Sequence, residues 1–317
     1  MLLSCGALVS YAGTQAEPLR GYAVDVWKSD NGLPQNTAAA ITQSADGFLW
    51  IGTQGGLARF DGSSFKILTR QSSPGLVDTE VRHLLAASDG SLWISTGGGL
   101  CRMNQGKIAE QEPREGVLAS KGLLFEDSRK QVYVAGETGL LLWRNGWNFT
   151  PAIGLPDKHV MAIAEDSGGR IWVGTQKGLC ELRGARCLVD KVPAPLRNFQ
   201  AYALYGDRED GLWLGGFGQV LYWNHNTLRV LSGANGIPDA RVTAITGDER
   251  GVWIGTSGGG IIRYVDDRVW RFTTHEGLSN DVVSNTAPWI PDPVRVACDR
   301  SEAVCARWQV GVVGVAA

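Results

Sequence analysis

Residues 49–53 of the chain read Leu-Trp-Ile-Gly-Thr, and this five-residue string returns at regular intervals. The later copies read Leu-Trp-Ile-Ser-Thr at 92–96, Val-Tyr-Val-Ala-Gly at 132–136, Ile-Trp-Val-Gly-Thr at 171–175, Leu-Trp-Leu-Gly-Gly at 212–216 and Val-Trp-Ile-Gly-Thr at 252–256. Successive copies are 43, 40, 39, 41 and 40 residues apart, measured between the aromatic positions Trp50, Trp93, Tyr133, Trp172, Trp213 and Trp253. Self-similarity at a fixed period of this length indicates a repeat architecture.

The residues around each string follow one pattern. A first turn such as Gly32-Leu33-Pro34 leads into a short run of small and apolar residues, and an Asp-Gly or similar turn then precedes the aromatic string. A Gly-Leu segment follows, and a second tight turn such as Asp61-Gly62 closes a hairpin onto one more segment. Asp-Gly is favoured there because both central residues of a type I′ turn have positive φ. Each repeat therefore predicts four short strands.

Four strands in about forty residues are typical of a propeller blade. The sequence predicts an all-β fold, a β-propeller of four-stranded blades with six full repeats and an incomplete seventh. A helical repeat of similar length is the rival, but the segments lack its 3.6-residue apolar period and its caps. Because a buried indole removes about 150–250 Å² of surface from water, the six aromatics are expected to pack between neighbouring blades rather than to bind ligand.

The two ends of the chain depart from the repeat. Residues 1–16 carry no charged side chain and resemble the apolar part of a secretory signal, with a simple N-terminal extension as the alternative. Residues 17–284 are assigned to the propeller, whose first segment, 22–27, resembles a fourth strand and is expected to pair with the last blade. No glycine occurs between Gly277 and Gly311, so residues 285–317 are predicted to be either an out-of-register tail or a divergent blade.

Three strings resemble the two-component regulator propeller repeat: Asn-Gly-Leu-Pro-Gln-Asn at 31–36, Gly-Phe-Leu-Trp-Ile-Gly-Thr at 47–53 and Gly-Leu-Ala-Arg-Phe-Asp-Gly at 56–62. The resemblance covers about residues 22–284. It implies the extracytoplasmic ligand-binding sensor region of a bacterial histidine kinase, hybrid two-component regulator or diguanylate cyclase. It also implies receptor dimerisation and a sensor module without its own output domain, because in such receptors the output domain follows a transmembrane helix.

Composition and motifs exclude several classes of function. The 30 Lys and Arg against 32 Asp and Glu leave a net charge of −2, which provides no basic surface for nucleic acid. No segment is long enough to span a membrane. The four histidines are 76, 66 and 50 residues apart and form no close metal-ligating set, and no nucleophile motif occurs. We therefore expect no metal, no cofactor and no catalytic residue.

Two cysteines lie near each other in one predicted hairpin. With Arg183-Gly184 as the turn, Cys180 is expected to lie opposite Cys187. A disulfide is allowed in an oxidising compartment, and two buried free thiols are the alternative that the sequence leaves open.

A ligand site is best sought where the repeats differ. The position at which each innermost strand is expected to begin, about thirteen residues before its aromatic, is polar and changes from repeat to repeat. In a propeller these positions surround one mouth of the central channel, with solvated loop residues as the alternative. Such a mixed ring suits a small polar ligand, for instance an oligosaccharide. Tyr202, Trp27 and Trp147 are candidates to stack on its sugar rings, with packing in the core as the alternative for each. The candidate ligand-binding residues are Thr37, Glu80, Lys121 or its neighbour Ser120, His159, Gln200 and Arg241.

The sequence thus predicts a periplasmic or otherwise extracytoplasmic propeller that binds a small ligand for a sensory receptor and is not an enzyme. A propeller lyase or hydrolase acting on glycans is one alternative, for which Glu80, His159 and Arg241 are the candidate groups. A protein-interaction propeller is the other, and it would show an exposed apolar patch on one face.

Overall fold

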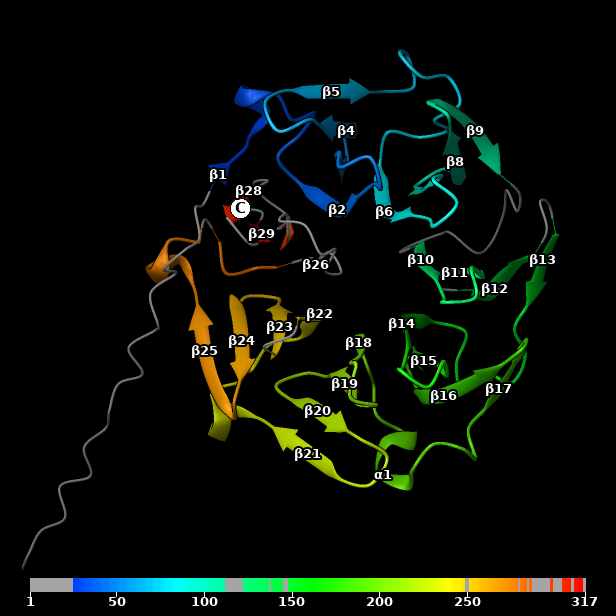
Figure 1. Ribbon diagram of the computed structural model, residues 1–317, viewed down its shortest axis with the longest axis vertical. Helices are drawn as coiled ribbons and strands as arrows, with labels where there is room; N and C mark the ends of the chain where they lie inside the picture. The colour runs from blue at the N-terminus through cyan, green and yellow to red at the C-terminus, as the bar shows by residue number, and fades with distance from the viewer. Residues whose placement is uncertain are drawn as a thin grey trace, which may run out of the picture.

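Six four-stranded antiparallel sheets follow one another around a ring (Figure 1). The computed structural model describes residues 25–111, 122–136, 138–144, 148–248, 251–278, 280–283, 285–286, 297–298, 304–308 and 311–315. Each sheet is one sequence repeat, and its strands are paired in chain order from the first to the fourth. The predicted all-β propeller with six full four-stranded blades is confirmed.

The strands of the six blades have the following bounds. Blades one and two comprise β2 (Ala38–Gln43), β3 (Leu49–Thr53), β4 (Gly56–Phe60), β5 (Phe65–Leu68), β6 (Val81–Ala86), β7 (Leu92–Thr96), β8 (Leu100–Asn104) and β9 (Lys107–Gln111). Blades three and four comprise β10 (Leu123–Glu126), β11 (Val132–Gly136), β12 (Gly139–Arg144), β13 (Asn148–Pro151), β14 (Val160–Glu165), β15 (Ile171–Thr175), β16 (Gly178–Arg183) and β17 (Arg186–Leu188). Blades five and six comprise β18 (Ala203–Gly206), β19 (Leu212–Gly215), β20 (Val220–Trp223), β21 (Leu228–Leu231), β22 (Val242–Asp248), β23 (Gly251–Thr256), β24 (Ile261–Val265) and β25 (Arg268–Phe272).

Helical segments are short in the described ranges. The α-helix α1 (Ala194–Arg197) lies between blades four and five, and 3₁₀ turns occupy Ser29–Asn31, Gly233–Asn235 and Thr274–Glu276. No helix among the described residues is long and apolar enough to cross a membrane. In each blade the first strand lies nearest the ring centre and the fourth lies at the rim, so the start of every first strand is available to a central site (Figure 1).

The position between blades six and one is filled differently. It holds a three-stranded sheet of β1 (Asp25–Val26), β28 (Val304–Trp308) and β29 (Gly311–Val315), and a two-stranded sheet of β26 (Asn285–Thr286) and β27 (Ala297–Cys298) (Figure 1). Asp25 of β1 pairs with Cys305 of β28, so the two ends of the described chain are joined by strand pairing. The segment 22–27 is expected to pair with the last blade; its described part, β1, pairs with β28 at the position between blades six and one.

The remaining boundary expectations are not tested. Residues 1–16, expected to be a signal peptide, lie outside the described residues. The described parts of 285–317 form separate small sheets rather than a four-stranded blade, so the incomplete seventh blade and the out-of-register tail stay predictions.

Neighbouring blades approach closely at the glycine of the repeat string. A β-carbon at Gly52 would clash with Cγ1 of Val81, the first residue of the next blade, and one at Gly215 would clash in the same way with Val242. Gly255 of blade six bears the same relation to Val283. The start of the seventh repeat therefore packs against blade six in the same way as blade two packs against blade one and blade six packs against blade five.

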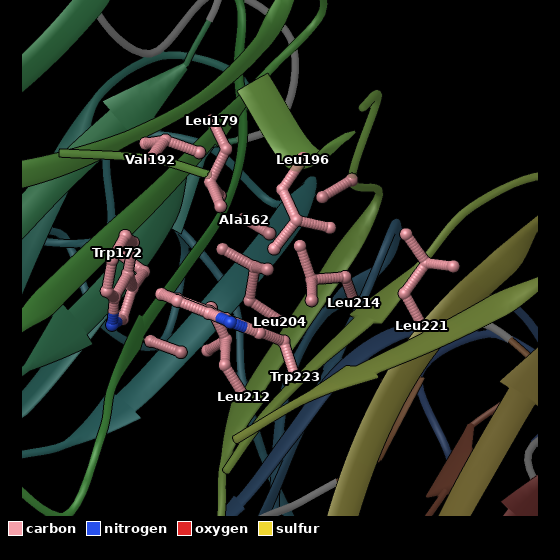
Figure 2. Packing of buried hydrophobic residues seen from close by; sticks show 12 residues of the cluster. Ala162, Trp172, Leu179, Val192, Leu196, Leu204, Leu212, Leu214, Leu221 and Trp223 are labelled. Carbon is pink, nitrogen blue, oxygen red and sulfur yellow. The ribbon is translucent and has the colours of Figure 1, made fainter. Parts of the chain in front are cut away.

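The six repeat aromatics are all buried, with Trp93 and Trp172 no more than 1% exposed. Trp172 of blade four packs in one apolar cluster with Leu204, Leu212 and Trp223 of blade five (Figure 2). Trp50, Trp93, Tyr133 and Trp213 likewise belong to clusters that include residues of the following blade. Apolar burial between sheets, worth about 25 cal/mol per Å², thus holds each blade to the next.

The polar edge of each buried aromatic needs a hydrogen-bond acceptor, and the residue six positions earlier supplies one in four blades. Nε1 of Trp172 donates to Asp166 at 2.7 Å and Nε1 of Trp213 donates to Asp207 at 3.1 Å. The equivalent acceptors are Ser44 for Trp50 and Asp127 for the hydroxyl of Tyr133, both at 2.9 Å. The turns before the aromatic strands therefore serve the core as well as the chain reversal.

Blade two lacks this acceptor. The residue six positions before Trp93 is Ala87, and Nε1 of Trp93 is buried without a hydrogen-bond partner in the described part of the chain. A buried unsatisfied N–H costs about 1–3 kcal/mol. Ser44 shows that a serine fits the same position of the repeat in blade one.

Replacing Ala87 with serine should stabilise the protein. The new hydroxyl would accept from Nε1 of Trp93, and we expect the free energy of unfolding to rise by about 1 kcal/mol. Urea unfolding followed by tryptophan fluorescence measures the change. The neighbouring substitution Ala86→Ser adds a hydroxyl away from the acceptor position and should give no gain; an Ala87→Ser protein no more stable than wild type would contradict the prediction.

Asp166 should make blade four sensitive to acid. Burial alone would raise the pKa of Asp166, but hydrogen bonds from Trp172 and Arg170 outweigh it and hold the pKa below its usual value. A carboxylate with a lowered folded-state pKa contributes stability above its unfolded pKa of about 3.9, and that contribution is lost as the pH falls through the folded value.

We therefore expect Asp166→Asn to lower the free energy of unfolding by about 1–3 kcal/mol at pH 7. The deficit relative to wild type should shrink as the pH falls below about 4. Melting curves across this pH range measure it. Asp190→Asn removes a carboxylate that is 73% exposed and should leave the curve unchanged. A deficit that is constant with pH would show that the charge of Asp166 is not the source.

Candidate functional site

A cavity of about 470 Å³ opens at the ring centre. Its lining includes residues from all six blades and Val282 from the start of the seventh repeat. Most of the wall is aliphatic, as in Val81, Ile163 and Leu204, because these side chains come from the buried first strands. The polar side chains of the lining are Thr37, Gln54, Glu80, Arg82, His83, Tyr202, Arg241, Thr243 and Ser257.

Three of the six predicted ligand residues lie in this lining. Thr37, Glu80 and Arg241 come from blades one, two and six, and each directly precedes the first strand of its blade. The structure therefore brings these three side chains to one cavity, while their contact with a ligand stays a prediction. Lys121 and Ser120 lie outside the described residues.

His159 and Gln200 are not among the residues that line the cavity. Nδ1 of His159 lies 2.8 Å from Oδ1 of Asp157, which also accepts from the His159 backbone N–H. Hydrogen bonds from His159 and a contact with Lys177 lower the pKa of Asp157 to about 2. Gln200 is turned toward Met161, 3.9 Å from its sulfur, and it is Met161 that lines the cavity.

The position predicted for blade five is displaced by two residues. β18 begins at Ala203, so the residue directly before the strand is Tyr202 and not Gln200. β18 has four residues and pairs with β19 without a register shift, whereas β2, β6 and β22 are longer and each shift register near their start, so the first strand of blade five begins closer to its aromatic. Tyr202 lines the cavity and takes the place that the spacing assigned to Gln200.

Blade two contributes an ion pair. The guanidinium of Arg82 lies on the carboxylate of Glu80 in a two-point contact, with Nε and Nη2 each donating to a different oxygen at 3.1 Å. Such paired contacts fix both planes as well as both charges. Arg82 was not among the predicted residues, although it lies two positions beyond Glu80 and both side chains line the cavity.

His83, the next residue of β6, is neutral. Burial lowers the pKa of His83 to about 4, and a backbone hydrogen bond with Leu84 offsets this only in part. The backbone N–H of Leu124 donates to Nδ1 of His83 at 3.4 Å. At neutral pH His83 therefore adds no charge to the cavity that it lines.

Arg241 and Tyr202 form a second pair across blades five and six. Cζ of Arg241 lies 5.5 Å from the centre of the Tyr202 ring, within the range of a cation–π contact. The Arg241 carbonyl accepts from the backbone N–H of Ser257, so the backbone is anchored at the same place. The ring gives the cavity a flat aromatic wall beside a positive charge.

A separate polar cluster joins blades four and five away from this cavity. Oxygens of Asp166 and Asp210 and a nitrogen of His225 lie within 4.8 Å of one another. Arg170 lies between them, 2.7 Å from Asp166, 2.8 Å from Asp210 and 2.6 Å from Nε2 of His225. The guanidinium already supplies the positive charge that these acceptors need, so the cluster is a structural ion-pair network.

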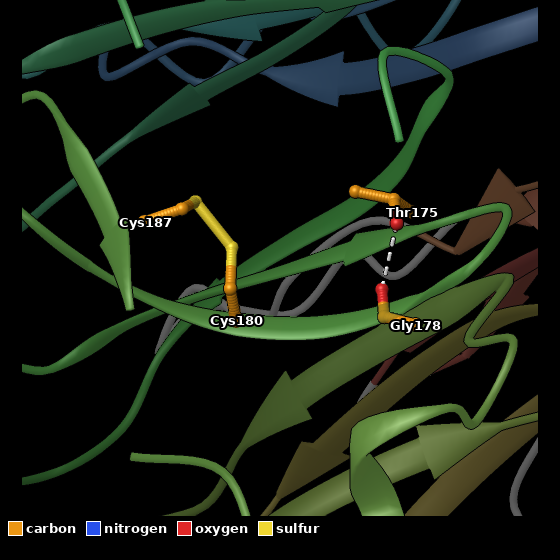
Figure 3. Close-up of a disulfide and its surroundings, with 4 residues drawn as sticks. All are labelled: Thr175, Gly178, Cys180 and Cys187. Carbon is orange, nitrogen blue, oxygen red and sulfur yellow. Dashed lines mark hydrogen bonds between the residues drawn. A yellow bond between two sulfur atoms is a disulfide. The ribbon is translucent and has the colours of Figure 1, made fainter. Parts of the chain in front are cut away.

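Cys180 and Cys187 are joined by a disulfide with 5.5 Å between their Cα atoms (Figure 3). The expected direct opposition is wrong, because Cys187 pairs with Leu182 across the hairpin and the turn is formed by Gly184 and Ala185. The two cysteines are diagonal neighbours on one face of the sheet. The bridge fastens the outer strand of blade four within an apolar cluster, and neither cysteine lines the cavity.

Comparisons with known proteins place this geometry in context. The family model for the two component regulator propeller matches residues 32–55 and 154–177. No curated protein matches the chain. Among solved structures, the extracellular domain of the hybrid two component system BT3049 from B. thetaiotaomicron is similar, with a TM-score of 0.71 and 18% identity over 92% of this chain. The chain spans 40% of the length of that domain.

Propellers that are named for other functions are similar as well. A streptogramin B lyase matches with a TM-score of 0.68 and 14% identity, over 94% of this chain and 98% of the lyase. YCF48 bound to D1 peptide matches with a TM-score of 0.65 and 10% identity, over 98% of each chain. At such identities the likeness concerns the fold alone. The segments that match the model of the two component regulator propeller are the first halves of blades one and four.

Proposed function

We propose that the chain is the ligand-binding sensor module of an extracytoplasmic bacterial receptor and carries no output activity of its own. The observation that carries this proposal is that the residues at the mouth of the cavity vary from blade to blade, whereas the residues that build the blades vary little. The repeat string is nearly the same in every blade, whereas Thr37, Glu80, Tyr202 and Arg241 differ at one mouth of one cavity. A mostly apolar cavity with a few convergent polar groups is the usual form of a small-molecule site.

The ligand class we propose is a small polar solute, for instance an oligosaccharide. Sugar rings present hydroxyls for paired donors and acceptors and an apolar face for an aromatic ring. Glu80, Arg82 and Thr37 offer donors and acceptors for the hydroxyls, and Tyr202 offers an aromatic ring for the apolar face. Two propellers of a dimeric receptor would report occupancy through a change in their packing, since a ligand shifts an equilibrium by its difference in affinity for two states.

An enzyme is the second candidate. The observation that favours it is that a neutral histidine, His83, shares the cavity with Glu80, Arg82 and Tyr202, and a lyase is among the similar folds. An acid–base role would require a proton donor and acceptor on one substrate. His159, predicted as a candidate for such a role, is not in the cavity lining.

A protein-interaction propeller receives less support. The large apolar side chains that are most exposed in the described residues are Ile153, Phe217, Leu228 and Val230. Ile153 follows β13, Phe217 lies between β19 and β20, and only Leu228 and Val230 share a strand, β21. These positions do not make one apolar face.

Thermal melting of the chain against a library of oligosaccharides and small polar solutes tests the sensor proposal. We expect one ligand class to raise the melting temperature, because ligand at 100 times its dissociation constant adds about 2.7 kcal/mol. Glu80→Gln should reduce the shift for that class. Glu209→Gln, an exposed turn substitution with the same change of charge, should retain it. A library that shifts nothing would contradict the proposal.

Incubation of each stabilising ligand with the protein separates sensor from enzyme. We expect the ligand to be recovered unchanged when its mass and reducing ends are measured after prolonged incubation. Product formation that disappears in His83→Ala, while ligand binding persists, would make the chain an enzyme and His83 its acid or base.

A further inference from the structure

The charges that face the cavity do not balance. Among the described residues of the lining, Glu80, Arg82 and Arg241 are the groups charged at neutral pH. Glu80 and Arg82 neutralise each other in their two-point contact. His83 is held neutral by its burial. One positive charge, that of Arg241, is left over.

Arg241 has no carboxylate within ion-pair distance among the described residues. Its side chain is held by the face of the Tyr202 ring, 5.5 Å from the ring centre, and not by an acid. A guanidinium that stacks on a ring keeps its N–H edge free, and that edge presents donors in a fork that fits an oxyanion. Among the described residues, no group accepts a hydrogen bond from the half-buried Arg241 side chain, so its donors are available to a ligand in the cavity.

The surrounding polar groups include donors that an acceptor on the ligand can use. The hydroxyls of Thr37 and Ser257 line the same cavity. Each carboxylate oxygen of Glu80 already accepts one hydrogen bond from Arg82, which leaves Glu80 fewer acceptor sites for a ligand. A ligand that matches this wall brings acceptors and negative charge.

We infer that the ligand of this cavity carries an oxyanion, a carboxylate or a sulfate, which the guanidinium of Arg241 binds. This inference rests on the proposed function and specifies its ligand. The oxyanion lies at the blade-six side of the mouth, against the free edge of Arg241. The rest of the ligand extends over the Tyr202 ring toward the donors of blades one and two. A neutral solute leaves the charge of Arg241 unmatched.

Matched pairs of compounds test the inference. Small acids, namely uronic-acid oligosaccharides and hydroxy acids, are each compared with their methyl esters, and sulfated sugars are compared with the desulfated forms. Binding is measured by thermal shift and by calorimetry on the full chain. We expect the acid or the sulfate to bind about tenfold more tightly than its neutral partner, as a charge-assisted paired contact requires. The acid and sulfate arms identify which oxyanion is bound.

Variants assign the effect to one side chain. In Arg241→Gln the preference for the charged partner should disappear, and in Arg241→Lys, which keeps the charge without the fork, it should be reduced. Arg186→Gln, an equal loss of charge at an exposed position of β17, should retain the full preference. Arg241 makes no described ion pair, so the variants should melt cooperatively near the wild-type temperature.

The outcomes separate the two proposals. Equal binding of charged and neutral partners would overturn the oxyanion inference and leave the sensor proposal standing. A preference that survives in Arg241→Gln would overturn the role of Arg241. Binding of no compound in either form would overturn both the inference and the proposed function.

Discussion

The closeness of neighbouring sheets is the constraint on which this propeller depends. At Gly52 and Gly215 there is no room for a β-carbon, because a valine that starts the next blade fills the space. An aromatic two residues earlier can then fit between the sheets, as Trp172 does in an edge-to-face contact with Trp223, with 5.3 Å between the ring centres. Threonine completes the string: Oγ1 of Thr175 donates to the carbonyl of Gly178 at 2.8 Å and tightens the following hairpin (Figure 3). The aromatic, the glycine and the threonine of the repeat string thus each have a distinct structural role.

This is why the fold could be predicted and the site only in part. Every blade must pack closely against its neighbours, so the residues that make this packing possible recur in the sequence six times. The mouth residues obey no such demand, and their positions had to be counted from the aromatic. That count holds at Thr37, Glu80 and Arg241, where the first strand starts as expected, and fails at Gln200, because β18 is short and lacks the register shift of β2, β6 and β22. Arg82 and His83 were detectable only as further polar residues on a first strand.

The cavity and the cluster at Asp166 illustrate two uses of the same residue types. In the cluster, Arg170 is surrounded by acceptors from two blades and stabilises the packing of the ring. In the cavity, Arg241 touches an aromatic face and faces open space. Charges that are paired within the protein stabilise its structure, whereas a cationic side chain without an acidic partner at a concave surface favours the binding of an anionic ligand. This difference, more than the fold, supports a binding function.

The division of labour within a blade has an evolutionary consequence. The residue before the first strand reaches the cavity in blades one, two, five and six, whereas the aromatic and the glycine of the repeat string make the close contacts between sheets. A substitution at Thr37 or Glu80 is therefore expected to change the solute that fits while the packing between sheets stays intact. Ligand specificity can therefore change by substitution at one mouth position at a time. A lineage carrying this scaffold could acquire new chemical signals without passing through unstable intermediates.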